Sequence, residues 1–594
     1  MPGMASRPSR PRPAAAAAAF VVVLAAAGCA AVPTSGPVQV AAGQGALSQQ
    51  QVYSQPIPEG PGRGWTPKEI VAGFLAACAS FAHNHGVARE YLDSTALENW
   101  KPGWAVTVES GLTTVAVTFP KQLTGQPNQL AKVKANGLPV ATLNGSGQYL
   151  PSSSAQPFNY SLVKVNGQWR IDSLPRSQLL LTENDFQRVY QPRDVYFLTQ
   201  SGNRLVPDPV FVPQQATNTE LATGLVQALL QNPTGWLEDA ATTGFPAHSY
   251  RIGQVRINGP NATVDLGGKA VTATHKQLRQ MAAQLVWTLA SGPIQSVQVQ
   301  LNGRTVLGGQ DQLLSTYQGW VRGQSSGSSL YFLNDNRVVQ DLAGAGQQGP
   351  GRVEEVQGAA GANPPPLSSI AVSPDRRSVA GIAAKGGSFY IGGMAHNAPL
   401  RELPTPTGTI TSLSWDAQGD LWIAAGGAVW VLPPGASTPL AVPVSVVPGG
   451  TVNDLRVAPD GVRAAMIVGN TDGKSRPQVQ VASITRGGSS ASIGPPLTLG
   501  SSIADPTALT WYGQDNLIVL AGNPGQLYEV PLNGGQPAPI PVTGGNPVSV
   551  SATGPENLTP DIAVGLSNGT VMVSSNQSGF EPTKAVGWVP AYPG

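Results

Sequence analysis

The chain has 594 residues, of which only 11% are charged, while 70 are Gly and 54 are Pro. This composition favours turns and short strands over long helices, and the length predicts roughly three to four domains. The formal net charge of +2 excludes a chain-wide basic surface for nucleic acid.

The first 29 residues have the order of a secretory signal. Three arginines precede an uncharged run, residues 14–28, which ends at Cys29. The run is shorter than the ~20 residues that a membrane-spanning helix requires, so it predicts export and not a span. Ala26-Ala27-Gly28-Cys29 resembles the lipobox of bacterial lipoproteins, with Ala26 where leucine is usual. The resemblance implies cleavage between Gly28 and Cys29, followed by S-diacylglycerol and N-acyl modification of Cys29.

Cleavage removes three positive charges, so the net charge of the mature chain becomes 2 − 3 = −1. We therefore expect residues 1–28 to be the signal peptide and membrane lipid to hold the chain through Cys29, on the extracytoplasmic face of the cell membrane. An ordinary signal peptide and an uncleaved anchor are the alternatives. Residues 29–62, rich in Pro, Gly, Ser and Gln, predict a flexible tether.

Residues 63–190 predict an α+β domain. Thr66, Pro67 and Glu69 form the signature of a helix start, and apolar residues follow at helical spacing on one face. Cys78 lies on that face, so we expect a buried structural thiol; with Cys29 acylated, a disulfide framework is excluded. A second helix is expected over 87–100, followed by strands and by a hairpin that turns on Asn166-Gly167.

Residues 191–322 predict a second α+β domain. Helices are expected over 221–230 and 276–290, with strands over 250–258, 262–266, 297–301 and 304–307. The stretches LVQALLQNPTGW, ATVDLG, LVWTLA and VQVQLNGR resemble the GerMN domain of spore-germination and envelope proteins. Such domains are binding or assembly modules, and no catalytic residues come with the resemblance.

Residues 323–594 contain a repeat. Similar strand openings recur at Ile370, Leu413, Leu455, Leu509 and Val550, with steps of 43, 42, 54 and 41 residues. This period is typical of four-stranded propeller blades, which must stack on their neighbours to bury both faces. The repeats predict an all-β propeller of about five to six blades, in which residues 330–339 supply a sixth blade or the strand that closes the ring. A pair of β-sandwiches is the alternative.

Other motifs are weak. His83 and His85 predict a surface loop, because two ligands without a third do not make a zinc site. Residues 323–327 match a nucleophile-elbow pattern but lie in a Gly/Ser linker, and residues 469–475 have three residues between glycines where a phosphate loop needs four. The acidic pairs Glu354-Glu355 and Asp416/Asp420 read as solvated turns. The sequence therefore predicts no catalytic residue, metal site or cofactor.

Taken together, the modules resemble one family. The lipobox, the tether, a first domain with GFLAACA and AREYLD, a GerMN domain and a C-terminal propeller are similar to the LpqB lipoproteins of actinobacteria. The resemblance implies a non-enzymatic regulatory protein that contacts the exoplasmic domain of the sensor kinase MtrB. An envelope carbohydrate-binding protein or a propeller hydrolase is the alternative.

Overall fold

The computed structural model describes residues 58–594, with gaps at 83, 104, 121–128, 153–156, 176–178, 215–216, 291–292, 322–328, 342–352, 447, 472–474, 489, 554–560 and 576–578. Most described elements are strands. No described helix is both long enough and apolar enough to cross a bilayer.

The first domain begins with three helices. In α1 (Pro67–Cys78), Thr66 and Glu69 form the predicted capping box, and the helix buries Ile70, Phe74 and Cys78. The second helix expected over 87–100 is wrong in detail, because two short helices occupy that stretch, α2 (Gly86–Arg89) and α3 (Ser94–Asn99). The backbone breaks where Asp93 caps α3 through its carboxylate and donates its own N–H to Ile171 O, 2.9 Å away.

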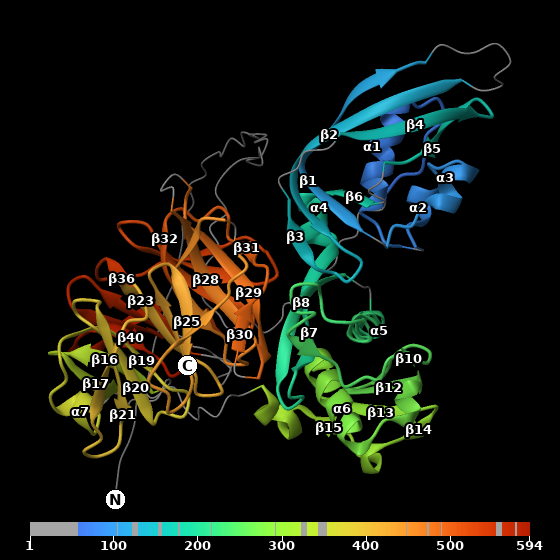
Figure 1. The fold of residues 1–594 in the computed structure, drawn as a ribbon. Coiled ribbons are helices and arrows are strands. Elements are labelled where there is room, and N and C mark those ends of the chain that lie inside the picture. Colours follow the sequence, from blue (N-terminus) through green and yellow to red (C-terminus); the bar gives the residue numbers. More distant parts are fainter. Residues whose placement is uncertain are drawn as a thin grey trace, which may run out of the picture. The chain divides into compact units, whose positions relative to one another are not determined.

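These helices lie on one face of a six-stranded sheet of order β5-β4-β2-β1-β6 with β3 beside β2 (Figure 1). The β4–β5 hairpin turns on Asn166-Gly167 as predicted, with positive φ at both residues. The helix α4 follows the last strand. The bounds are β1 (Val106–Thr118), β2 (Leu130–Leu143), β3 (Tyr149–Pro151), β4 (Phe158–Val165), β5 (Gln168–Ser173), β6 (Leu179–Thr182) and α4 (Glu183–Val189).

The second domain combines a βαβ unit with a long hairpin. Helix α6 (His275–Leu289) connects the parallel strands β12 (Asn261–Gly268) and β13 (Ser296–Leu301). The hairpin of β7 (Tyr190–Thr199) and β8 (Leu205–Pro213) packs with α5 (Asn218–Leu229) in the core. The remaining short elements are β9 (Ala241–Thr242), β10 (Ser249–Arg251), β11 (Arg256–Asn258), η1 (Lys269–Thr272), β14 (Arg304–Thr305), η2 (Leu307–Gly309), β15 (Gln312–Leu313) and η3 (Leu314–Trp320).

In this domain the expected helices and strands are confirmed with two changes of length. The strand expected over 250–258 is two strands, β10 and β11, interrupted by Gly253, which has a φ of 65°. The strand expected over 304–307 ends at Thr305, because Leu307 also has a positive φ, 57°. A positive φ departs from the extended backbone of a strand, so both interruptions are local backbone effects.

The last region is a β-propeller of six blades, each an antiparallel meander. The helix α7 (Ala359–Ala362) precedes the first complete repeat. From inner to outer strand the blades are β19 (Leu367–Val372), β20 (Ser378–Ala383), β21 (Ser388–Gly393), β22 (Leu400–Pro404); β23 (Ile410–Trp415), β24 (Leu421–Ala425), β25 (Ala428–Leu432), β26 (Leu440–Val442); β27 (Gly450–Val457), β28 (Arg463–Asn470), β29 (Gln478–Gly487), β31 (Leu497–Leu499); β32 (Pro506–Tyr512), β33 (Asn516–Ala521), β34 (Gln526–Pro531), β35 (Ala538–Ile540); β36 (Pro547–Ala552), β37 (Ile562–Leu566), β38 (Thr570–Ser575), β39 (Gly579–Val586); and β40 (Trp588–Ala591), β16 (Leu330–Asn334), β17 (Arg337–Asp341), β18 (Val353–Glu355).

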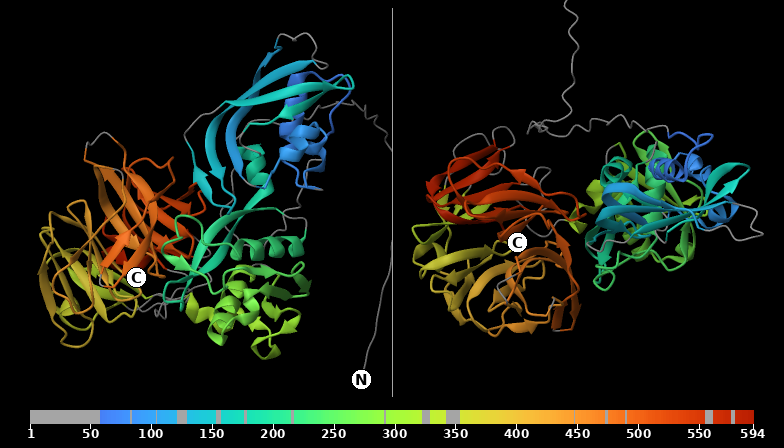
Figure 2. Two further views of the ribbon diagram at one scale, coloured as in Figure 1. Left: turned by 45° about the vertical axis from the view of Figure 1, so that its right-hand side comes forward. Right: turned by 90° about the horizontal axis from the view of Figure 1, so that it is seen from above.

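The sixth blade joins the two ends of the propeller sequence. Its inner strand β40 is C-terminal and pairs with β16, which lies at the start of the region, so residues 330–339 supply a blade that the C-terminal strand completes. The long repeat step of 54 residues has a local cause, since β29 extends into an extra hairpin with β30 (Ser490–Ile493) before β31. Figure 2 shows the blades arranged around an axis, with the C-terminal end near the centre.

Candidate functional site

The inner strands of the propeller are tied to one another by hydrogen bonds that cross from blade to blade. The donors are backbone N–H groups in most cases, and the acceptors are mostly side chains of the neighbouring inner strand. The links are Trp415 Nε1 to Ala371 O (3.2 Å), Leu455 N to Ser412 Oγ (2.9 Å), Leu509 N to Asp454 Oδ2 (3.0 Å), Ala552 N to Thr510 Oγ1 (3.3 Å), Tyr592 N to Ser551 Oγ (2.9 Å) and Gly594 N to Val372 O (3.0 Å). These polar groups stabilise the ring, because each satisfies a buried or half-buried backbone partner.

The propeller axis is filled by protein. Arg456 donates from Nη1 to Leu413 O (2.6 Å) and from Nε to Leu509 O (3.3 Å), so its guanidinium connects three inner strands. Tyr592 and the two residues after it line the same space, which leaves a cavity of about 60 Å³. This volume is well below the ~300 Å³ typical of small-molecule sites, so the centre of the ring is a packed core.

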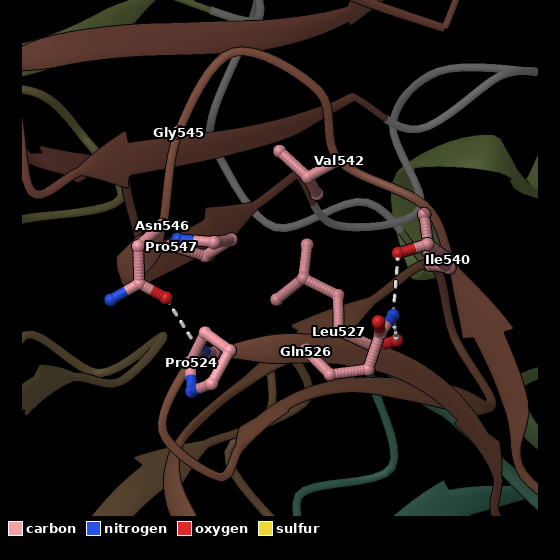
Figure 3. A pocket seen from close by; sticks show the side chains of 9 residues that line it. Pro524, Gln526, Leu527, Ile540, Val542, Gly545, Asn546 and Pro547 are labelled. Carbon is pink, nitrogen blue, oxygen red and sulfur yellow. Dashed lines mark hydrogen bonds between the residues drawn. The ribbon is translucent and has the colours of Figure 1, made fainter.

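A larger pocket, of about 250 Å³, lies at the edge of the fourth complete repeat. Gln526 donates to Leu527 O and Ile540 O, both at 2.9 Å, and Asn546 Oδ1 accepts from Gly525 N at 2.6 Å (Figure 3). These bonds fix the polar side chains to the wall. The remaining lining is mainly apolar and comprises Pro524, Leu527, Ile540, Val542 and Pro547. The pocket can therefore take a small group, such as a side chain of a bound segment.

The acidic pair Asp416/Asp420 was expected to be a solvated turn, and for Asp416 this is wrong. Asp416 is 1% exposed; its Oδ1 accepts from Gln418 N and Asp420 N, and its Oδ2 accepts from Trp422 Nε1 at 2.8 Å. Arg486 forms ion pairs with both carboxylates. Burial raises the pKa of Asp420, Asp416 raises it further, and Arg486 opposes both effects. The pair therefore stabilises the hairpin between β23 and β24.

The second acidic pair lies at a blade edge. Glu355 forms an ion pair with Arg337, and both side chains are 48% exposed, in accord with a solvated position. The phosphate-loop-like stretch begins in β28 and leads to β29, which pairs with it, so it connects two strands of a blade; its residues 472–474 lie outside the described residues. Of the elbow-like stretch 323–327, no residue is described.

The prediction that His85 lies in a surface loop is also wrong, because its side chain is buried. It is 5% exposed and packs against Phe81 and Trp100, with ring centroids 4.8 and 5.6 Å away. Burial, reinforced by Arg89, lowers the pKa of His85 to about 4, so the imidazole is neutral near pH 7. His83 lies outside the described residues. Among the residues that the structure describes, no three His, Cys, Asp or Glu side chains are grouped as metal ligands.

Cys78, the last residue of α1, is buried as predicted, with 0% exposure in the core of the first domain. Burial raises the pKa of its thiol, which keeps it protonated and unreactive. Gly28 and Cys29, the expected cleavage and lipidation residues, lie outside the described residues.

Sequence reasoning missed the closed ring of hydrogen bonds and the blocked axis. The signal that could have found them is a polar residue inside four of the six inner strands, at Ser412, Asp454, Thr510 and Ser551. The alternation of polar and apolar residues along a strand, taken alone, predicts that such polar residues lie on the solvent face.

Comparison with family models covers most of the chain. Residues 60–187 match the model described as "Lipoprotein LpqB, N-terminal domain", residues 194–307 match "Sporulation and spore germination", and residues 344–593 match "Lipoprotein LpqB beta-propeller domain". Among solved structures, TolB from Acinetobacter baumannii is 14% identical, with a TM-score of 0.34, and the match covers 53% of this chain and 86% of TolB. That similarity is too low to add to the assignment.

Several curated relatives are similar along most of their length. Lipoprotein LpqB of Thermobifida fusca is 33% identical over 566 residues, covering 86% of this chain and 88% of the relative. Lipoprotein LpqB of Streptomyces coelicolor is 30% identical, with 85% of each chain covered, and that of Mycobacterium tuberculosis is 27% identical, with 83% and 84% covered. The identity to the Thermobifida fusca protein over most of both chains, together with the two LpqB family models matched, shows that this chain belongs to the LpqB lipoprotein family.

Proposed function

We propose that the chain is a membrane-anchored, non-enzymatic binding module on the extracytoplasmic face, which modulates the exoplasmic domain of an MtrB-type sensor kinase. The observation that carries the proposal is membership in the LpqB lipoprotein family over most of the chain. The lipobox-like sequence before Cys29 supports the anchoring through diacylglycerol and an N-acyl chain.

The use of polar groups in the propeller supports a binding role over a catalytic one. A hydrolase needs a nucleophile or base that is poised by its neighbours and open to substrate. In the propeller, by contrast, Asp416 and Asp454 accept hydrogen bonds from backbone or indole N–H groups, and Arg456 donates to two carbonyl oxygens at the axis. These charged groups are engaged in holding strands together.

The pocket of Figure 3, where Leu527, Ile540 and Val542 lie beside polar groups, offers a place for a side chain of a protein partner. The side chains of Gln526 and Asn546 already form hydrogen bonds with backbone groups of the pocket. A partner side chain can therefore enter the pocket and bury surface without breaking these bonds. Attachment to the same membrane would raise the effective concentration of module and kinase, which makes modest intrinsic affinity sufficient.

The test is calorimetric titration of residues 46–594 with a purified exoplasmic domain of an MtrB-type kinase. We expect a dissociation constant on the order of 1 μM, corresponding to about 8 kcal/mol. Val542→Asp, which places a charge in the pocket, should weaken the binding if the pocket takes part, whereas the matched exposed change Val548→Asp should not. Absence of binding up to near-millimolar concentration, with hydrolysis of an envelope polysaccharide by the same preparation, would replace the proposal with the enzyme alternative.

A further inference from the structure

The outer face of the first domain's sheet, opposite the helices, is unusual in its side chains. Along β2 the buried residues alternate with exposed ones, because successive side chains of a strand point to opposite faces. Ala131, Val133 and Ala135 point toward the helices. The exposed residues of the strand are Leu130, Lys132, Lys134, Asn136 and Leu138.

We call Leu130, Lys132, Lys134 and Leu138 the lysine face. The side chains beside its two lysines are uncharged. Lys132 lies between Thr118 of β1 and Ser161 of β4, and Lys134 lies between Ala116 and Asn159. Cross-strand partners of opposite charge would neutralise a lysine in a sheet, and these registers supply none.

The surrounding sequence extends the same charge pattern. Residues 110–171 contain no Asp or Glu, although they make up about a tenth of the chain, and they include the cations Lys121, Lys132, Lys134, Lys164 and Arg170. Glu109, the acidic residue just before this stretch, is 2% exposed. The lysine face therefore has uncharged cross-strand neighbours, in a chain whose expected mature net charge is −1, and the next acidic residue along the chain is Asp172 of the edge strand β5.

Apolar side chains accompany the lysines at the surface. Leu138 is 68% exposed and Leu130 is 37% exposed, at the two ends of the lysine face, and Val115 of the neighbouring strand is 52% exposed. A single exposed leucine needs no explanation. Several exposed apolar side chains beside two lysines without acidic partners are typical of a surface that binds at a lipid–water interface. There the ammonium groups contact anionic headgroups, and the apolar side chains insert at the boundary of the acyl chains.

We propose that the lysine face lies on the anionic surface of the lipid bilayer to which the chain is anchored. The occupant follows from charge complementarity and from the position of the domain in the chain. Residues 30–57 connect the expected lipid-bearing Cys29 to the first described residue, and 28 residues span no more than about 100 Å even when fully extended. The first domain is thus the folded part that follows the expected anchor most directly along the chain. The proposal rests on the membrane anchoring and is independent of the kinase contact.

Sedimentation of residues 46–594 with lipid vesicles tests the proposal without the lipid anchor. We expect binding to vesicles of phosphatidylcholine with about one third phosphatidylglycerol, weaker binding as salt increases, and no binding to pure phosphatidylcholine. Each lysine near such a surface contributes about fivefold to the partition coefficient. Lys132→Gln/Lys134→Gln should therefore lower it about 25-fold, and Leu138→Ser should lower it further.

The matched control is Lys68→Gln/Lys101→Gln, which removes the same two charges from the helical side of the same domain. This control should retain most of the binding. All these positions are exposed, so melting temperatures should change little, and calorimetric binding to the kinase domain should be unchanged in K132Q/K134Q. Equal losses in the two double variants, or binding of the chain to a soluble acidic polypeptide but not to the anionic vesicles, would overturn the proposal.

Discussion

Removal of the Asp416 carboxylate should destabilise the propeller strongly. The change Asp416→Ala leaves three N–H donors without their acceptor, those of Gln418, Asp420 and the Trp422 indole. The indole is fully buried, so its lost bond should cost about 1–3 kcal/mol, and the two backbone bonds about 0.5–1.5 kcal/mol each. Arg486 is 29% exposed and regains water, so its lost ion pair adds little. The expected total is about 2–6 kcal/mol.

The assay is calorimetric melting of residues 46–594. For a domain of this size, a loss of about 2–6 kcal/mol lowers the melting temperature by about 5–20 °C. The control is Asp375→Ala in the corresponding hairpin of the neighbouring blade, where an exposed carboxylate accepts from Ser373 Oγ and Arg377 N. This control should cost less than about 1 kcal/mol. Equal shifts in the two variants would refute the reasoning that burial of the acceptor sets the magnitude.

Three further changes test other parts of the chain. The folded-state pKa of His85 lies below its ordinary value, so the neutral imidazole stabilises the domain above pH 6.5, and up to about 3 kcal/mol of stability is lost as the pH falls toward 4. The variant His85→Asn, in which Asn tolerates the φ of 59°, should remove this part of the pH dependence of the unfolding free energy measured in urea. An unchanged pH dependence would contradict the prediction. Removal of residues 588–594 deletes the inner strand of the sixth blade and should lower the melting temperature by more than about 10 °C; cooperative melting at the original temperature would show that the ring does not need this closure. Cys29→Ala should release the chain from membranes into the soluble fraction, because residues 14–28 are too short to span a bilayer; mature-sized variant that stays membrane-bound would exclude the lipid anchor.

The local elements were predictable because they depend on neighbours in the sequence. The capping box of Thr66 and Glu69, the buried Cys78 and the hairpin at Asn166-Gly167 each follow from residues within one or two turns of the chain. Repeats have the same property, because each propeller blade is a local meander. The lipobox-like signal before Cys29 is a linear motif, so it too can be read without a fold.

What the tertiary structure decided is how distant residues share burial and charge. Asp416 was predicted to be solvated because its own turn is polar. In the structure Arg486, 70 positions later, forms an ion pair with its carboxylate, and the buried Trp422 indole donates a hydrogen bond to it. His85 follows polar neighbours in the sequence, yet Trp100 and Phe81 enclose it. The closure of the ring by β40 and β16 pairs strands more than 250 residues apart. The alternating pattern of β2 predicts that its lysines point to one side, but only the pairing with β1 and β4 places uncharged residues beside them, because strand register is set by the whole sheet.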